Sequence, residues 1–377
     1  MRIVFIVPGG FDRSGRERVI PALLWLVERL ARRHEVHVCV TSGAGAPATY
    51  RLAGATIHDL GTIPAGLPGS RMARLWRRLL RALAPVARSG RIDAFHGFWA
   101  GTSGVLAGLA GKRFGAMVVV SIGGGELVWL PEIGYGGLGS WRGRAQARLA
   151  LSLADIVTGG SRYALGPLAG RAAVRWVPLG VDSAAFDWPV ERPPGPAWRL
   201  VHVASINRVK DQETLLRALR AIVDREPAAQ LDWAGEDTLG GALRRRCAEL
   251  GLSQHIQFHG FLPSDAVAAL YRAAHVHVLS SRHESQAVVV GEAAAAGVPT
   301  VGTAVGIIPE LAPAAAVAVP VGDAEALAAG ALALLHDPPR RELMGRAAQD
   351  WARRYDADWT AAQFERIYAG LALNLER

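Results

Sequence analysis

The first forty residues contain the pattern that most restricts the folds open to this chain. An apolar run at residues 2–8, RIVFIVP, is followed by Gly9, Gly10 and a polar loop. The next segment, VIPALLWLVERLARR, has apolar residues at helical spacing and a basic last turn, and HEVHVCVTSG predicts a second strand. A buried strand, a glycine turn, a helix and a strand in this order indicate a doubly wound α/β domain with a parallel sheet.

The alternation of strands and helices resumes after a Pro-rich, polar segment at 187–198, DWPVERPPGPAW. This composition is typical of a linker, and 377 residues are enough for two domains of ordinary size. We therefore expect domains at 1–186 and 199–350, followed by a C-terminal segment at 351–377. The first turn lacks G-x-G-x-x-G, which removes the main support for a nicotinamide or flavin cofactor.

Composition limits the partners without selecting one. The net charge is +9 and comes almost entirely from arginine, a balance that suits a phosphorylated substrate, an anionic membrane or nucleic acid. No aromatic-interleaved basic motif supports nucleic acid. Cys39 and Cys247 are too few and too distant in sequence for a disulfide framework or a C-x-x-C site. The opening apolar run is too short for a signal peptide, and no run of eighteen apolar residues predicts a membrane span, so cytoplasm is the expected location.

One segment, RMARLWRRLLRALAPVAR at 71–88, alternates leucines with arginines and contains no acidic residue. Two interpretations stay open. The segment is either an amphipathic helix packed on a sheet with its arginines in water, or a helix lying on an anionic membrane near a lipid-linked acceptor.

The stretch from Ser280 to Leu311 has the strongest chemical pattern. Glu284 and Glu292 flank seven uncharged residues, and the Ala-rich run that follows is ended by Gly297 and Pro299. The pattern predicts a loop, a helix, a strand and a second loop, with Glu292 about two turns, or roughly 12 Å, beyond Glu284. A helix N-terminus suits phosphate, and flanking carboxylates could hold hydroxyls. On spacing alone, a surface helix with two solvated glutamates fits as well.

This stretch, E-x7-E followed by EAAAAGVPTVGTAVGIIPEL, resembles the donor-site signature of the retaining glycosyltransferases of family 4. A second segment, VHVASINRVKDQETLLRAL, is similar to the family's V-G-R-L-x-x-x-K-G-x-x-x-L-L-x-A. Lys210 falls on the family's lysine, while Ser205 stands in place of the usual arginine and Asp211 in place of the usual glycine. We expect Arg208 to supply the missing cation.

The resemblance implies an assignment of the donor site. Glu292 would hold the donor ribose, and Glu284 would hold hydroxyls of the transferred sugar. Lys210 and Arg208 would neutralise the diphosphate as it leaves. No D-x-D motif for a metal ion appears, so we expect neither a metal nor another cofactor.

Backbone groups complete this expected donor site. Those of Gln286, Ala287 and Val288 would hold the sugar and the distal phosphate. The segment HGFLP, which includes Gly260 and Phe261, resembles the family's loop near the donor base.

The first domain is expected to contact the acceptor. The segment VVVSIGGGEL resembles the family's V-x-x-H-G-x-E/D-L, but Gly123 stands where the family has a histidine beside the sugar. His96, in the neighbouring segment FHGFW, and Glu126 are candidates to face the same place. The first-domain loop would approach the donor phosphates or the acceptor through three glycines: Gly9, Gly10 and Gly15.

The implied fold is GT-B: two facing Rossmann-like domains with a cleft between them, and a C-terminal helix that crosses back to the first. The implied reaction moves a sugar from a nucleotide-diphosphate sugar to a hydroxyl of a glycan, a lipid-linked or a small-molecule acceptor, with retention of configuration. Two alternatives remain: an epimerase or phosphorylase on the same fold, or a non-catalytic protein that binds sugars or lipid head groups.

Overall fold

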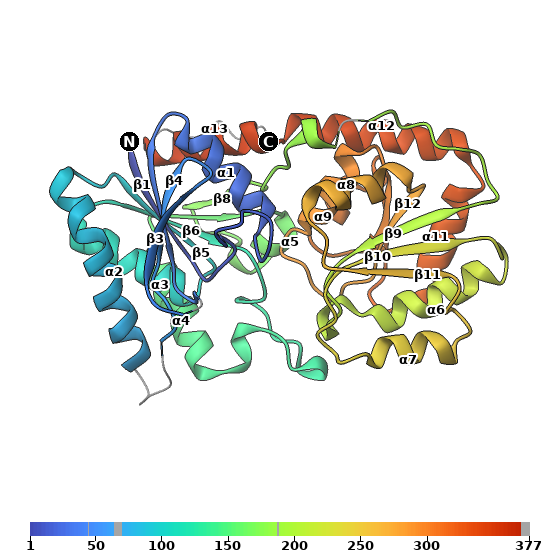
Figure 1. Cartoon of the computed structure of the whole chain (residues 1–377), viewed down its shortest axis with the longest axis horizontal. Helices are drawn as coiled ribbons and strands as arrows, with labels where there is room; N and C mark the ends of the chain where they lie inside the picture. The colour runs from blue at the N-terminus through green and yellow to red at the C-terminus, as the bar shows by residue number, and fades with distance from the viewer. Residues whose placement is uncertain (44, 64–69, 187, 371–377) are drawn as a thin grey trace. The chain divides into compact units, whose positions relative to one another are not determined.

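The computed structural model describes residues 1–43, 45–63, 70–186 and 188–370. The chain divides into two compact units. The first comprises residues 1–160 and 164–179 together with the C-terminal segment from 357, and the second comprises 161–163 and 180–356. Each unit is a parallel-sheet α/β structure (Figure 1).

The sheet of the first unit has eight strands in the order β3-β4-β2-β1-β5-β6-β7-β8. They are β1 (Arg2–Val7), β2 (Glu35–Val40), β3 (Ala48–Leu52), β4 (Ala55–Asp59), β5 (Ala94–Phe98), β6 (Met117–Ile122), β7 (Ile156–Gly159) and β8 (Val174–Trp176). All neighbours are parallel except β3 and β4. These two form a hairpin whose turn residues, Ala53 and Gly54, have φ of 49° and 77°, as a two-residue hairpin turn requires.

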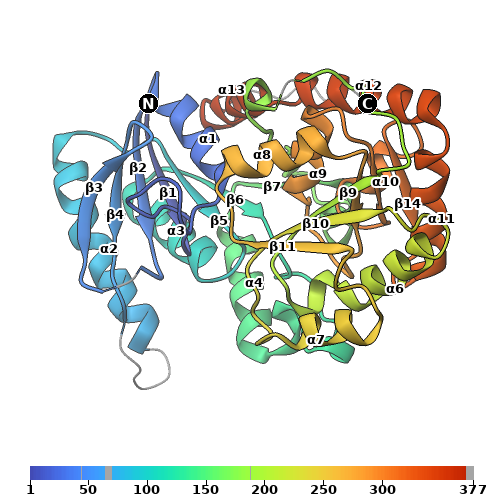
Figure 2. The ribbon, with the colours of Figure 1, turned by 45° about the vertical axis from the view of Figure 1, so that its right-hand side comes forward.

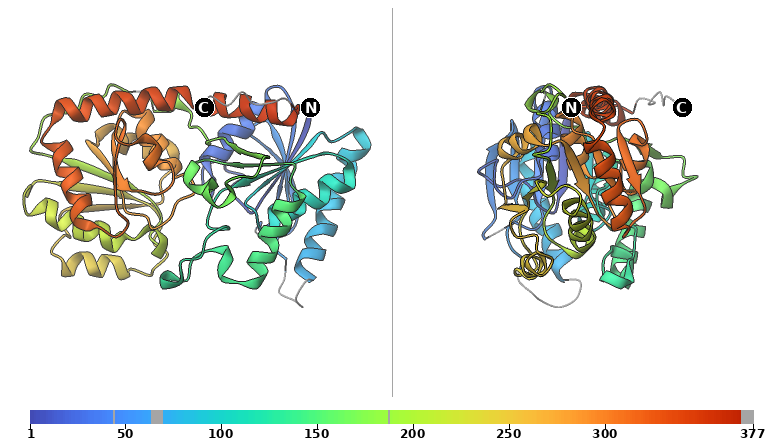
Figure 3. Two further views of the ribbon diagram at one scale, coloured as in Figure 1. Left: turned by 180° about the vertical axis from the view of Figure 1, so that it is seen from behind. Right: turned by 90° about the vertical axis from the view of Figure 1, so that its right-hand side faces the viewer.

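Among the described residues, the α-helices that belong wholly to the first unit are α1 (Pro21–Ala31), α2 (Ser70–Ser89), α3 (Thr102–Phe114), α4 (Trp141–Leu153) and α13 (Ala357–Tyr368). Successive strand residues point to opposite faces, so β1 contributes Phe5 and Val7 to a core with α1 and α13, and Val4 and Ile6 to a core with α2 and α3. Because both faces are covered, the strand sequence is a continuous apolar run. Helices α3 and α4 pack side by side, as the view from behind shows (Figure 3).

The Arg-Leu segment forms helix α2, and its leucine face packs on the sheet. Leu75, Leu79 and Leu83 are fully buried against the sheet, while four arginines are exposed: Arg71, Arg77, Arg81 and Arg88. The helix is packed on the sheet, and its leucine face is not free to enter a membrane. Within the described residues, no helix combines the length and apolarity that crossing a bilayer requires.

The second unit has six parallel strands in the order β11-β10-β9-β12-β13-β14 (Figure 2). They are β9 (Arg199–Val203), β10 (Gln230–Ala234), β11 (Ile256–Gly260), β12 (Val276–Leu279), β13 (Thr300–Thr303) and β14 (Ala316–Val319). The helices are α6 (Gln212–Val223), α7 (Ala242–Glu249), α8 (Ser264–Ala273), α9 (Val288–Ala295), α10 (Ile308–Leu311), α11 (Ala324–Leu335) and α12 (Pro338–Arg354). The short helix α5 (Arg162–Leu165) spans the division between the units.

The observed division differs from the predicted boundaries. It falls after Leu179 rather than after residue 186, and the chain returns to the first unit at Ala357 rather than at 351. The described part of the expected linker, 188–198, packs on the second unit. Its Trp198 is buried, and the Arg192 guanidinium donates to Ala274 O at 3.0 Å and Ala296 O at 2.7 Å. The Pro-rich composition therefore corresponds to irregular backbone packed on the second unit, and not to a flexible linker.

Each sheet reverses its strand order at one place. In the first sheet the reversal lies between β1 and β5, and in the second it lies between β9 and β12. Loops that leave the carboxyl ends of such strands diverge, and ligands of open α/β sheets bind in the space they leave. The loops after these four strands are therefore the first places to look for a site.

Candidate functional site

The switch point of the second sheet brings a lysine and a carboxylate together. Lys210 ends the loop after β9, and Glu284 lies on the loop after β12. Lys210 Nζ is 2.5 Å from Glu284 Oε1, and the two side chains are only 22% and 11% exposed. Ser281 Oγ donates to the same carboxylate oxygen at 2.6 Å. The site has a fixed charge pair with one edge open to solvent.

A second ion pair joins these same two loops. Arg282 Nε lies 3.2 Å from the buried carboxylate of Asp211, and Arg282 N donates to Val209 O at 2.8 Å. Asp211 also accepts from Thr214 Oγ1 at 3.0 Å. The sequence interpretation missed Arg282, although a cation two residues before Glu284 was a visible signal.

Two residues of the site hold backbone conformations that favour glycine. Asp211 has a φ of 49° and Ala287, immediately before α9, has a φ of 67°. The left-handed region costs an L-residue roughly 1–2 kcal/mol. At Asp211, where the resemblance expects glycine, the chain has changed the residue and kept a backbone that glycine would adopt more easily.

Both glutamates are withdrawn from solvent, so the interpretation of two solvated glutamates on a surface helix is wrong. Glu292 lies on the second turn of α9 and is 7% exposed. Because α9 begins only at Val288, the predicted two helical turns between Glu284 and Glu292 are a loop followed by one turn of helix. Burial raises the pKa of its carboxyl to about 7, and no described residue forms a hydrogen bond or ion pair with that carboxyl group. A buried carboxyl group without a partner is suited to receive a hydroxyl.

Some of the other residues predicted to bind the donor are more exposed than Lys210 and Glu284. Arg208 opens the turn that ends at Lys210 and is exposed, and Ser205 is exposed while its carbonyl accepts from Gln212 Nε2 at 2.9 Å. Gly260, at the end of β11, has a φ of 68°, and Phe261 beside it is 49% exposed.

One of the backbone groups just before α9 already has a hydrogen-bond partner within the protein. Gln286 O accepts from Ile307 N at 2.9 Å, and a Cβ on Gly306 would come within 2.6 Å of the same oxygen. This close approach explains a glycine at 306. Gln286 and Ala287 are buried, and Val288, the first residue of α9, is partly exposed.

In the first unit, the three predicted glycines differ from one another. A Cβ on Gly9 would meet no atom within 4 Å, whereas one on Gly10 would lie 2.6 Å from the Ile20 side chain. Gly15 has a φ of 65°, and a Cβ there would lie 3.1 Å from Leu52. Gly9 alone among them faces open space.

His96 is a core residue, and the expectation that it contacts substrate is wrong. It lies within β5, is fully buried, and bonds to Tyr368 Oη at 2.6 Å and Ser121 Oγ at 2.7 Å. Burial lowers the pKa of its imidazole to about 3. Strand residues alternate between faces, and this one points into the core formed with α13.

The side chain of Glu126 forms hydrogen bonds within the protein. Its carboxylate accepts from the backbone N–H groups of Gly123 at 2.9 Å, Gly124 at 2.8 Å and Ala100 at 3.2 Å. Burial raises the pKa of this carboxyl, although these three bonds favour its charged form. Glu126 thus closes the glycine turn after β6, and because it is partly exposed, its predicted place near the acceptor stays a prediction.

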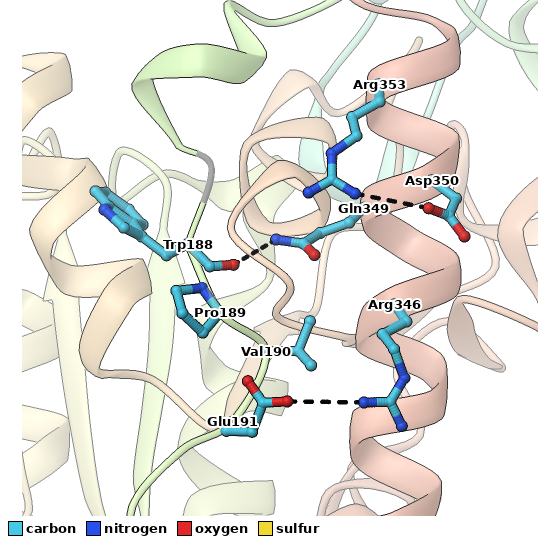
Figure 4. A pocket seen from close by; sticks show the side chains of 8 residues that line it. All are labelled: Trp188, Pro189, Val190, Glu191, Arg346, Gln349, Asp350 and Arg353. Atoms are coloured by element: carbon cyan, nitrogen blue, oxygen red, sulfur yellow. Dashed lines mark hydrogen bonds and ion pairs between the residues drawn. The ribbon is translucent and has the colours of Figure 1, made fainter.

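A separate cavity of about 500 Å³ lies elsewhere in the second unit (Figure 4). Its lining comprises Trp188, Pro189, Val190, Glu191, Arg346, Gln349, Asp350 and Arg353. Gln349 Nε2 donates to Ala295 O at 3.2 Å, so the cavity adjoins the last turn of α9, at the opposite end from Glu284. It includes none of the predicted site residues. The described ranges contain no cluster of three or more His, Cys, Asp or Glu side chains placed to hold a metal ion.

Comparison with solved structures defines the fold class. The chain matches sucrose-phosphate synthase from Thermosynechococcus elongatus with a TM-score of 0.77 and 18% identity, over 98% of this chain and 99% of that one. The protein therefore has the GT-B fold. A family model described as "Glycosyl transferases group 1" matches residues 187–351, and a "Glycosyl transferase 4-like domain" model matches 19–179. The two glycosyltransferase models together cover most of the chain, which is therefore a glycosyltransferase with the GT-B fold.

Curated relatives match over a smaller share of the chain than the solved structure does. The chain is 32% identical to the D-inositol 3-phosphate glycosyltransferase of Corynebacterium aurimucosum over 46% of this chain and 43% of that protein. It is 29% identical to the GDP-mannose-dependent alpha-(1-6)-phosphatidylinositol monomannoside mannosyltransferase of Mycolicibacterium smegmatis over 67% of this chain and 71% of that protein. The match thus spans less than half of the first relative's length.

Proposed function

We propose that this protein transfers a sugar from a nucleotide-diphosphate sugar to an acceptor hydroxyl, with retention of anomeric configuration and without a metal ion. The observation that carries the proposal is the pairing of Lys210 with Glu284 at the switch point of the second sheet. The match to two glycosyltransferase models supports the same reaction class.

The donor would displace the internal pair. A diphosphate carries more negative charge than one carboxylate, so Lys210 would turn from Glu284 to the phosphates, and the exposed Arg208 would add a second cation. Two cations stabilise the charge that develops on the leaving diphosphate. Glu284, released from Lys210, would accept hydrogen bonds from hydroxyls of the sugar.

Glu292 would bind the ribose of the donor. Its carboxyl is buried, has a raised pKa and has no partner among the described residues. A ribose hydroxyl both donates and accepts hydrogen bonds, so it would satisfy the group in either protonation state. Because the carboxyl group is largely withdrawn from water, such a bond would contribute more than one at the surface.

Among the described residues of the second unit, neither Glu284 nor Glu292 is proposed as a dedicated general base. Once released from Lys210, the carboxylate of Glu284 would be occupied by hydroxyls of the sugar, and Glu292 is buried within α9. We propose that the departing phosphate takes the acceptor proton on the same face of the sugar, which is consistent with retention.

The acceptor is proposed to be a glycan, a lipid-linked or a small polyhydroxylated molecule. Both relatives named above bear inositol-containing acceptors in their names, one free and one lipid-linked. Peripheral contact with an anionic membrane would rest on the exposed arginines of α2, because its leucines are buried. Such contact would be electrostatic and would weaken with added salt.

The test is a transfer assay with radiolabelled UDP- and GDP-sugars against methyl glycosides, D-inositol 3-phosphate and phosphatidylinositol vesicles. The expected result is a product whose anomeric configuration, read by NMR, matches the donor, at a rate unchanged by EDTA. An inverted product would exclude the retaining mechanism. Turnover that consumes donor with water or phosphate alone would favour a hydrolase, epimerase or phosphorylase.

A further inference from the structure

The first sheet has a switch point of its own, between β1 and β5, and the residues there have no role so far. The loop after β1 begins with Pro8 and Gly9, and the residue after β5 is Trp99. The glycine turn after β6 adjoins them, because β6 is the next strand in the sheet. A ligand of this unit would be expected in the same relative place that Lys210 and Glu284 occupy in the other.

Trp99 has an unusual backbone at this place. Its φ is 71°, a left-handed conformation that is a genuine outlier for a bulky residue. The fold imposes it from both sides, because Trp99 N donates to Ser121 O at 2.8 Å and Gly104 N donates to Trp99 O at 3.1 Å. Strain of this kind costs of order 1–3 kcal/mol and tends to be kept where a side chain must be aimed.

The indole of Trp99 lies on the glycine turn. A Cβ on Gly123 would come within 3.1 Å of the ring atoms Cε2 and Nε1, and one on Gly124 within 2.9 Å of Nε1. Glu126 fixes both segments, since its carboxylate accepts from the N–H groups of Ala100, Gly123 and Gly124. The ring thus lies against bare backbone on one side, packs in part against the core formed with α1 and α13, and remains partly exposed.

We propose that Trp99 is a binding residue for the acceptor, and that its indole stacks on the C–H face of a polyhydroxylated six-membered ring, either a sugar or a cyclitol. That the bound ring belongs to the acceptor rests on the proposed function, whereas the binding of such a ring to Trp99 does not. An indole offers a rigid apolar face at low entropic cost. A Cβ on Gly9, in the loop after the adjacent strand β1, would meet no atom within 4 Å.

The ligand class follows from what surrounds the ring. Within the turn, the one carboxylate is engaged by three N–H groups, and His96, on strand β5 just before Trp99, is buried in the core. Neither presents a charge toward the indole face. An apolar platform with peripheral backbone groups suits a ring whose hydroxyls point outward and whose C–H bonds point at the indole.

The experiment uses saturation-transfer difference NMR on the full chain with three probes: myo-inositol, D-inositol 3-phosphate and methyl α-D-glucopyranoside. The variants are Trp99→Leu, which keeps bulk without an aromatic face, Trp99→Phe, and Trp129→Ala as a control. Trp129 is a tryptophan of the same unit, 44% exposed. Thermal unfolding establishes that each variant folds.

We expect at least one probe to receive saturation in the wild type, mainly at its axial C–H protons. Trp99→Leu should weaken that probe's affinity about tenfold or more, Trp99→Phe should stay within about threefold, and Trp129→Ala should leave it unchanged. Stabilisation by nucleoside diphosphates should be the same in all four proteins. Comparing the two inositols separates recognition of the ring from recognition of a phosphate.

Three results would overturn the assignment. They are no saturation of any probe, equal affinity in Trp99→Leu and wild type, and a loss of nucleoside diphosphate binding in Trp99→Leu, which would place the base on this ring. If nucleotides fail to bind the wild type while ring probes depend on Trp99, the proposed transfer reaction fails and the ring site stands.

Discussion

Lys210 and Glu284, 74 residues apart in sequence, are joined by a 2.5 Å contact between Nζ and Oε1 at the switch point of the second sheet. The contact gives the unliganded site an internal counter-ion. A partly buried ammonium without a counter-ion would lose solvation without compensation. A phosphorylated ligand must therefore compete with the Glu284 carboxylate for Lys210. We expect substitution of Lys210 to weaken ligand binding, and substitution of Glu284 to leave it unchanged or strengthen it.

Lys210→Ala should weaken nucleoside diphosphate binding about tenfold or more, because a charge-assisted bond contributes about 1.5–3 kcal/mol. Isothermal titration calorimetry measures the change. Arg225→Ala is the matched control, since Arg225 is an exposed cation at the end of α6 in the same unit. Equal losses in both variants would mean that general positive charge, not this lysine, attracts the ligand.

Glu284→Gln should separate binding from turnover. The substitution frees Lys210 from its counter-ion, so a nucleoside diphosphate without sugar should bind as well as in the wild type or somewhat more tightly. Sugar transfer should nevertheless fall about 100-fold, by roughly 2.7 kcal/mol at 1.36 kcal/mol per decade, because the carboxylate would no longer hold the sugar hydroxyls. Unchanged transfer would remove Glu284 from the site.

Ala287→Gly should stabilise the protein by about 0.5–1 kcal/mol. Relief of the left-handed conformation at φ 67° exceeds the extra entropy that glycine loses on folding. Asp211→Gly relieves a similar backbone but loses the Arg282 ion pair and the Thr214 hydrogen bond, so no gain is expected. Urea unfolding compares the two, and a gain at Asp211 alone would contradict this account.

Glu292 should make stability depend on pH. Burial raises the pKa of its carboxyl from 4.5 to about 7, so between these values the folded protein keeps a proton that the unfolded chain releases. The stabilising contribution is complete below about pH 4.5 and is lost as the pH rises through 7. Glu292→Gln stays neutral throughout. It should be more stable than the wild type at pH 8, by of order 1–3 kcal/mol, and closer to it at pH 5.

Urea unfolding at both pH values measures this difference. A constant difference between wild type and Glu292→Gln would show that the carboxyl is not the titrating group. The same variant should bind nucleoside diphosphates less tightly if Glu292 holds the ribose.

The sequence predicted the parts of this molecule that depend on local patterns. The buried strands, the helix after Glu284 and the loop containing Lys210 all follow from apolar periodicity and glycine punctuation, and the resemblance identified the fold. The leucine face of α2 was visible as well, but periodicity gives a helix an apolar face without saying what covers it. Packing on the sheet decides that question.

Contacts between distant segments could not be predicted in the same way. His96 ends in the core because Tyr368, on the C-terminal helix, and Ser121 bond to it. The Asp211–Arg282 pair requires two loops that only the strand order brings together. The left-handed backbone of Trp99 follows from hydrogen bonds to strand β6 and helix α3, which its neighbours in sequence do not indicate.

The most direct test of the central claim is thermal stabilisation by a panel of UDP, GDP, ADP and their sugar conjugates, with and without EDTA, in wild type and Lys210→Ala. Ligands that bind only the folded state raise the unfolding temperature by mass action. We predict stabilisation selective for one base, unaffected by EDTA and strongly reduced in Lys210→Ala. Folded protein that responds to none of these nucleotides, or responds equally in the variant, would contradict the donor site at the β9–β12 switch point.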